Sequence, residues 1–155
     1  MDARQFEEEV KAKMEASRIA YNNGDPGFFK FFAKDATVFS AISSEAIKGR
    51  EAYQRHFEPK LKGEKREVKI LDQNLQLIGE RAVIAQTAQI RVGDITSNIR
   101  QTIVWANTDE GVVVQHLHTT LIGTPVSDSI PKSAGAIRVL NEKIATIASV
   151  LGVAQ

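Results

Sequence analysis

Four long segments rich in β-branched residues constrain the fold of this chain more than any other feature. They occupy residues 66–79, 81–92, 95–107 and 111–123, and turn sequences separate them: Gly79-Glu80, Gly93-Asp94 and the string TDEG. Short connections with glycine between such segments are typical of β-hairpins. The second half of the chain is therefore predicted to be a meander of antiparallel strands.

Helical spacing dominates the first 61 residues. In residues 2–23, Phe6, Val10, Met14, Ser17 and Tyr21 fall on one stripe, and the NNGDP sequence that follows ends the helix. Residues 27–35 predict a short second helix, residues 36–42 a strand, and residues 49–61 a third helix that ends near Pro59. Helices followed by a meander indicate an α+β fold in which the helices cover one sheet face.

The composition fits one globular domain without a charged partner. The chain has 155 residues, a net charge of +1 and no cysteine, so we expect no nucleic-acid or membrane partner and no disulfide. With no apolar h-region at its N-terminus, it is expected to be cytoplasmic. The basic residues between Arg50 and Arg66 alternate with glutamates, which favours a solvated surface.

The last thirty residues are predicted to be a separate unit. Residues 1–125 form the domain, and residues 126–155 form a polar linker and a helix over residues 136–151. Ile137, Leu140, Ile144, Ile147 and Leu151 step by three and four along that helix. A coiled coil this short would be marginal alone, so we expect the helix to dock on its own or a neighbouring subunit.

Several strings resemble the nuclear transport factor 2-like superfamily, which includes SnoaL-like cyclases and ketosteroid isomerases. They are YNNGD, FFAKDATVF and IKGREAYQRHF. Within it, LQLIGERAVIAQTAQIRV and TIVWANTDEGVVVQHLHTT are most similar to the association domain of calcium/calmodulin-dependent protein kinase II. The resemblance implies a cystatin-like cone, with three N-terminal helices on a curved, mostly antiparallel sheet, in a homodimer or larger ring.

The resemblance does not carry over the working residues of either relative. The carboxylate base, the tyrosine donor and the second acid of a ketosteroid isomerase fall on Ser40, Ser17 and Thr102. A hydroxyl cannot replace a carboxylate base near neutral pH. The pocket arginines of the association domain match Ile103 and Thr119, and a pocket histidine matches Tyr53. A cavity with a neutral lining is what the resemblance leaves, with unknown catalytic residues and no cofactor.

Strand alternation selects the side chains that face this cavity. The even residues of 82–92 and the odd residues of 99–105 are the more apolar sets, and on the last strand the resemblance selects the odd set. Three glutamines then point inward. We predict a pocket for a small, largely apolar, uncharged ligand, lined by Tyr21, Tyr53, Gln86, Gln101, Ile103, Trp105, Gln115 and Thr119.

The paired histidines are assigned to the opposite face. His116 and His118 share one side of the last strand, with Arg100 expected beside them. An arginine repels a cation, so no metal site is predicted, and the three residues are assigned to a subunit interface. Two alternatives stay open: a SnoaL-like enzyme using Asp35, Asp72 or His118, and a pure oligomerisation module.

Overall fold

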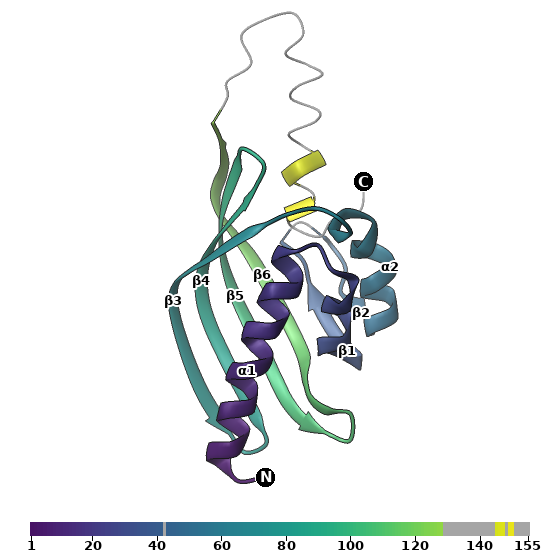
Figure 1. Cartoon of the computed structure of the whole chain (residues 1–155), viewed down its shortest axis with the longest axis vertical. Coiled ribbons are helices and arrows are strands. Elements are labelled where there is room, and N and C mark those ends of the chain that lie inside the picture. Colours follow the sequence, from purple (N-terminus) through teal and green to yellow (C-terminus); the bar gives the residue numbers. More distant parts are fainter. Residues whose placement is uncertain (42, 129–144, 148, 151–155) are drawn as a thin grey trace, which may run out of the picture.

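The chain folds into a curved six-stranded sheet with helices packed against one face (Figure 1). The computed structural model describes residues 1–41, 43–128, 145–147 and 149–150. Its elements are α1 (Ala3–Asn22), the short 3-10 helix η1 (Pro26–Phe31), β1 (Phe32–Phe39), β2 (Ile47–Lys48), α2 (Arg50–Leu61), β3 (Glu67–Ile78), β4 (Arg81–Val92), β5 (Ile95–Thr108) and β6 (Gly111–Ser127). The predicted α+β class is confirmed.

The sheet has the order β2-β1-β6-β5-β4-β3. Strands β3 to β6 form the predicted antiparallel meander, and two-residue turns join β3 to β4 and β4 to β5. Strand β1 pairs with β6 in parallel and with the short β2 in antiparallel orientation. The two strands nearest the N-terminus thus extend the sheet beyond β6, so that residues far apart in sequence share its inner face, the face that packs against α1.

Helix α1 begins and ends where its sequence dictates. The Asp2 side chain accepts a hydrogen bond from the Gln5 backbone N–H, and the Gln5 side chain accepts one from the Asp2 N–H, which is a capping box. At the other end Gly24 has a φ of 62°, a left-handed conformation that glycine adopts without strain. Phe6 and Val10 are buried, as their place on the apolar stripe predicts.

The segment after α1 differs from its prediction. Residues 27–35 were expected to be helical throughout, but η1 ends at Phe31 and β1 already begins at Phe32. The prediction was wrong at this boundary because closely spaced phenylalanines fit a helix and a strand buried on both faces equally well. Phe28, Phe29 and Phe32 are buried in the main core.

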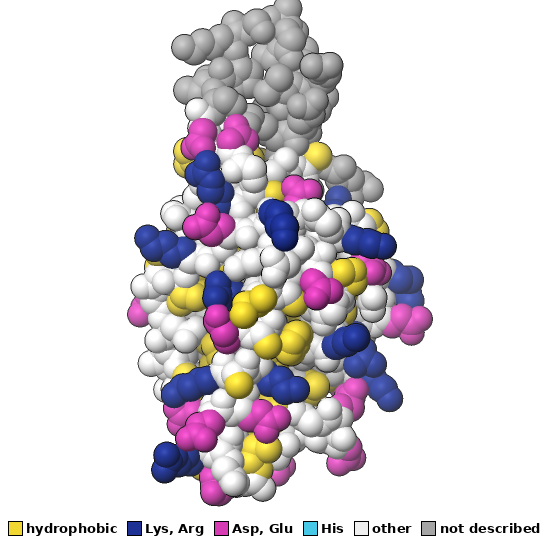
Figure 2. All heavy atoms as spheres, viewed as in Figure 1, with side chains coloured by type: hydrophobic (Ala, Val, Ile, Leu, Met, Phe, Trp, Pro, Cys, Tyr) yellow, Lys and Arg dark blue, Asp and Glu magenta, His cyan; other side chains and the backbone are white. Residues whose placement is uncertain are grey.

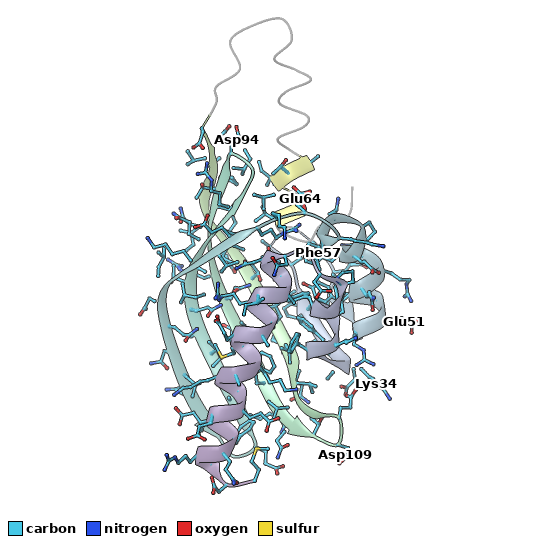
Figure 3. The ribbon with its side chains drawn as sticks, in the orientation of Figure 1. Lys34, Glu51, Phe57, Glu64, Asp94 and Asp109 are labelled. Atoms are coloured by element: carbon cyan, nitrogen blue, oxygen red, sulfur yellow. The ribbon has the colours of Figure 1, made fainter. Side chains whose placement is uncertain are left out.

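Helix α2 closes the core against η1 and β1. Its Tyr53, Phe57 and Leu61 are buried, and Figure 3 shows Phe57 inside the molecule, whereas Glu51 of the same helix points outward. The helix runs to Leu61 with Pro59 inside its last turn. On the face shown in Figure 2, basic and acidic side chains alternate without a patch of one sign.

The described part of the C-terminal helix packs on the same chain. Residues 145–147 and 149–150 are helical, while residues 136–144, 148 and 151 of the predicted helix lie outside the described residues. Ser149 and Val150 are buried. Val150 packs in a second apolar cluster with Ala88, Ile90, Val92 and Ile99, which extends the core toward the β4–β5 end of the sheet.

Candidate functional site: a cavity between helix α1 and the sheet

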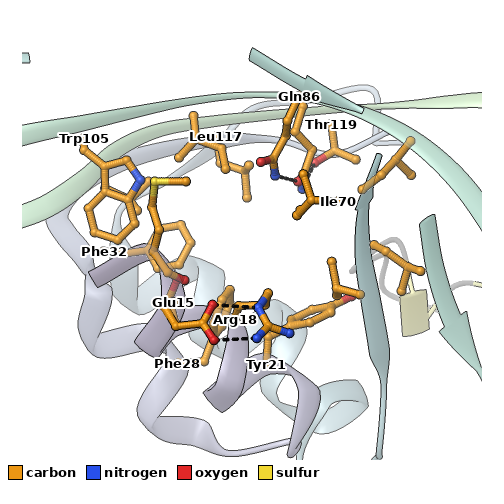
Figure 4. A pocket seen from close by; sticks show the side chains of 18 of the residues that line it. Glu15, Arg18, Tyr21, Phe28, Phe32, Ile70, Gln86, Trp105, Leu117 and Thr119 are labelled. Carbon is orange, nitrogen blue, oxygen red and sulfur yellow. Dashed lines mark hydrogen bonds and ion pairs between the residues drawn. The ribbon is translucent and has the colours of Figure 1, made fainter. Parts of the chain in front are cut away.

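A cavity of about 420 Å³ lies between α1 and the inner face of strands β3 to β6. Figure 4 looks into it: Glu15 and Arg18 of α1 lie on one side, and Trp105, Leu117, Gln86 and Thr119 of the sheet lie on the other. The sheet curves around α1 (Figure 1), and the cavity lies between the helix and the concave side of the strands.

One end of the cavity is an aromatic wall. Its members are Tyr21, Phe28, Phe32, Tyr53 and Phe57, which all line the cavity. The Tyr53 ring stacks on Phe57 at a centroid distance of 5.8 Å and meets the Phe32 ring edge-on at 5.0 Å. Such contacts fix the rings and make the wall rigid. Burial raises the pKa of Tyr21 and of Tyr53, so both phenols keep their protons at neutral pH.

A chain of hydrogen bonds between side chains crosses the sheet at the other end. The Gln73 amide donates to Gln86 (2.8 Å), Gln86 donates to Gln101 (2.8 Å), and Gln101 donates to the Thr119 hydroxyl oxygen (3.1 Å). All four residues line the cavity, one from each of the four strands β3 to β6. We call this chain the amide ladder. It supplies a polar but uncharged strip on an otherwise apolar floor.

Trp105 is the other polar group of the floor. The side chain lines the cavity and is 1% exposed, and no described residue accepts a hydrogen bond from its indole Nε1. In Figure 4 the nitrogen edge of the ring faces the space between the labelled side chains. A buried donor without an acceptor costs about 1–3 kcal/mol, and among the described lining residues this N–H is the buried donor that has none.

Charged side chains line the cavity on the α1 side alone. Glu15 and Arg18 form a two-bond ion pair at 2.6 and 3.0 Å, and this hydrogen bonding lowers the pKa of Glu15. Lys11 also lines the cavity and pairs with Glu7, one turn earlier on the helix. Each charged side chain that α1 contributes to the cavity thus has a partner on the same helix. Glu15 is the one carboxylate among the described residues that line the cavity.

Arg66 lies buried behind the aromatic wall, although the sequence predicted a solvated position. It is 6% exposed, and its guanidinium donates to the carbonyl oxygens of Lys60, Leu61 and Glu64 and to Ser149. The same group lies over the Tyr21 ring at 5.3 Å. Carbonyls at the C-terminal end of α2 carry partial negative charge, which explains how a cation is held here without a carboxylate among its described partners.

The structure brings together most of the predicted lining. Tyr21, Tyr53, Gln86, Gln101, Ile103, Trp105 and Thr119 all line the cavity. Gln115 does not, and its predicted inward orientation was wrong. Its amide oxygen accepts a hydrogen bond from Arg81, an odd-numbered residue of β4, whereas the even-numbered residues of that strand form the inner face.

A β-bulge explains the position of Gln115. In the pairing of β5 with β6, Trp105 lies opposite Val114 and Val104 lies opposite His116, which leaves Gln115 as an extra residue. A bulge shifts the alternation by one residue. Val114 therefore lines the cavity before the bulge, and Leu117 and Thr119 line it afterwards.

Gln73, Glu15 and Arg18 line the cavity without having been predicted. A sequence signal existed for Gln73: the apolar residues of β3 change from even positions (Val68, Ile70) to odd ones (Leu75, Leu77), and the register shifts between them. Glu15 and Arg18 flank the apolar stripe of α1, and nothing in the sequence marks these two charged side chains as part of a cavity.

His116 and His118 lie away from the cavity. The His116 Nδ1 and the Thr37 hydroxyl are 2.6 Å apart, and the Phe39 ring meets both imidazoles edge-on at 5.0 and 5.5 Å. His118 is exposed, as is Arg100. We call the side of the sheet that carries these residues the outer face, and their assignment to a subunit interface stays a prediction.

The residues considered for catalysis do not gather in one site. Asp35, Asp72 and His118 are exposed, and none of them lines the cavity. Of the positions equivalent to isomerase acids and bases, Ser17 lines the cavity, while Thr102 is exposed and Ser40 lies outside the lining. Within the described part of the chain, no three His, Asp or Glu side chains are grouped as metal ligands would be.

Comparisons with solved structures identify the fold. A nuclear transport factor 2-like protein of unknown function from Pseudomonas putida KT2440 is 21% identical, with a TM-score of 0.71 over 83% of this chain and 99% of that one. A putative association domain of calcium/calmodulin dependent protein kinase II from Xanthomonas campestris is 22% identical, with a TM-score of 0.61 over 74% of this chain and 86% of that one. A domain of unknown function with a cystatin-like fold from Nostoc punctiforme PCC 73102 is 20% identical, with a TM-score of 0.62 over 94% and 98% of the two chains.

The sequence itself gives the family. No curated protein matches the chain, and no helix in the described ranges is long and apolar enough to span a bilayer. The family model of the calcium/calmodulin dependent protein kinase II association domain matches residues 6–123, which run from the first turns of α1 to the last part of β6. The chain therefore belongs to the calcium/calmodulin-dependent protein kinase II association domain family.

Proposed function

We propose that this protein binds a small, largely apolar, uncharged molecule in the cavity between α1 and the sheet. The observation that carries the proposal is the cavity itself, whose volume of about 420 Å³ falls within the range of about 300–1,000 Å³ for ligand pockets. Aromatic and aliphatic side chains with a few placed polar groups are the usual lining of such pockets.

The charges around the cavity favour a neutral ligand. A buried ion needs a partner of opposite charge, and the ion pair of Glu15 with Arg18 is already closed on itself. The positions equivalent to pocket arginines of the association domain hold Ile103 and Thr119, both at the cavity. A carboxylate ligand would therefore lose its hydration without gaining a free cation.

A second candidate function is assembly, and the outer face of the sheet favours it. Phe39 is 43% exposed there, beside His116 and His118, and the family is described as an association domain. Binding and assembly use opposite faces of the sheet, so one protein can do both. We propose a homodimer or a larger ring of subunits.

The binding proposal is tested by titrating the protein with para-ethylbiphenyl and following heat release by calorimetry. We expect saturable binding of one molecule per chain. Ile103→Phe places a larger side chain in the cavity and should weaken binding at least tenfold. Thr102→Phe is the matched control, because the neighbouring residue of β5 is exposed and does not line the cavity. Equal affinity for both variants would place binding elsewhere and contradict the proposal.

A further inference from the structure

We infer that the ligand carries an uncharged hydrogen-bond acceptor, such as a ketone, quinone or ester oxygen, that binds the indole N–H of Trp105. This inference rests on the proposed function and adds to it the chemistry and the orientation of the bound molecule. It follows from which hydrogen-bonding groups of the cavity are already satisfied and which are not.

The indole N–H is a donor without an acceptor. Trp105 is 1% exposed, lines the cavity, and has no described hydrogen-bond partner for its Nε1. Indole nitrogen can only donate, so a ligand that satisfies it must bring a lone pair. A ligand hydroxyl can also accept, but a purely apolar group would leave the N–H buried and unpaired.

The other polar groups of the floor are already engaged. Gln86 both donates and accepts within the amide ladder, and so does Gln101. Tyr21 donates its hydroxyl proton to the Val150 carbonyl oxygen. Of the buried side-chain nitrogen and oxygen atoms without a partner among the described residues, the Trp105 Nε1 is the one that lines the cavity, while the ladder can add bonds to a ligand but does not require them.

The geometry sets the shape of the molecule. Trp105 and Gln101 share the inner face of β5. They are four residues apart, so their Cα atoms lie about 13 Å from each other at the usual rise per residue. Ile103 and Leu117 lie opposite each other between these positions and are apolar. Figure 4 shows Leu117 between Trp105 and the pair of Gln86 and Thr119. An elongated molecule with an apolar middle and an acceptor at one end matches this arrangement.

The charge of the acceptor follows from its surroundings. Val114 lies opposite Trp105 in the pairing of β5 with β6, and Phe32 and Leu117 lie on either side of it in Figure 4, while the ion pair of Glu15 with Arg18 lies on the α1 side. A carboxylate beside Trp105 would have a single neutral donor for its charge, whereas a carbonyl oxygen needs no more than that.

Three probes of the same length test the inference on the full chain. These are para-acetylbiphenyl, which ends in a ketone, para-ethylbiphenyl, which replaces the ketone by a hydrocarbon, and biphenyl-para-carboxylate. Trp105 is the only tryptophan of the sequence, so a proton–nitrogen correlation spectrum contains one indole signal. We expect the ketone to bind about tenfold more tightly than the hydrocarbon, as one hydrogen bond to a buried donor implies, and to move the indole proton downfield.

Trp105→Phe supplies the control. This variant keeps an aromatic ring but has no N–H, so the ketone and the hydrocarbon should bind it with equal affinity. If the variant does not fold, the indole signal of the native protein decides the question. Equal affinity of the native protein for ketone and hydrocarbon, with an unmoved indole signal, would overturn the inference and leave the proposed function standing. Tighter binding of the carboxylate would overturn the neutral acceptor, and failure of all three probes to bind would overturn the proposed function as well.

Discussion

Gln101 holds the centre of the amide ladder, where it accepts a hydrogen bond from Gln86 and donates one to Thr119. A leucine side chain has a similar size, but it makes neither hydrogen bond and leaves the Gln86 side-chain N–H without its acceptor. We expect Gln101→Leu to lower the free energy of unfolding by about 1–2 kcal/mol, measured by urea denaturation. Gln76→Leu is the control, since Gln76 is exposed on β3 and its replacement should change stability by less than about 0.5 kcal/mol. Equal stability of the two variants would show that the ladder contributes nothing to the fold.

At the same scale, alternation predicted single residues wherever a strand is regular. Gln86 and Gln101 lie on the inner face as expected, because β4 and β5 pair without a register shift. The predicted orientation of Gln115 was wrong because Gln115 is the extra residue of a β-bulge. The VVVQHLH string has apolar residues on both faces, so it carries no sign that the alternation shifts there. The burial of Arg66 could not be predicted either, because its partners are backbone carbonyls, which every sequence possesses, and one serine far away in the sequence, Ser149.

At the scale of elements, the loops after α1 and α2 lock together at Gly24. The Gly63 N–H donates to the Gly24 carbonyl, and the Arg66 N–H donates to the Asn22 carbonyl. A Cβ atom on Gly24 would lie 2.5 Å from the Glu64 carbonyl oxygen and 2.6 Å from that of Leu61. The sequence predicted Gly24 as the end of a helix, but this second role depends on the approach of α2 and was not visible there.

Gly63 provides a matched comparison for Gly24. Both have positive φ, at 62° and 76°, but a Cβ on Gly63 would meet nothing within 4 Å. We expect Gly63→Ala to cost about 1–2 kcal/mol for the left-handed backbone alone. Gly24→Ala should cost that amount plus the clash with the α2 loop, at least about 2 kcal/mol more. Thermal unfolding of the two variants measures the difference, and equal melting temperatures would mean that the two loops are not tightly joined.

Element boundaries were predictable where one signal acts alone. The ends of α1 follow from Asp2 and Gly24, and the hairpin turns follow from their glycines. The boundary between η1 and β1 was misplaced because tertiary burial, not local propensity, decides the conformation of a phenylalanine-rich segment.

At the scale of the whole molecule, the cavity is a property of curvature and not of any one residue. The sequence predicted a neutral lining, to which the structure adds the charged side chains of Lys11, Glu15 and Arg18 from α1. The volume of the cavity depends on how far α1 stays from the sheet. The register shifts in β3 and β6 increase the local twist of the strands, and they carry no strong sequence signal. The family and the fold could therefore be anticipated from the sequence, and the shape of the site could not.

The outer face of the sheet leads to a prediction about assembly. Phe39 is 43% exposed beside the two histidines, and aromatic residues are enriched in subunit contacts relative to the rest of the surface. We expect light scattering after size-exclusion chromatography to give at least twice the chain mass of 17.1 kDa. Phe39→Asp should lower this mass toward that of one chain, because a carboxylate placed in an apolar contact would lose its hydration. Ile19→Asp is the control, since Ile19 is 48% exposed on α1, away from that face. A native protein with the mass of one chain, or a Phe39→Asp variant that assembles as the native protein does, would show that this face does not join subunits and would leave the cavity as the functional part of the fold.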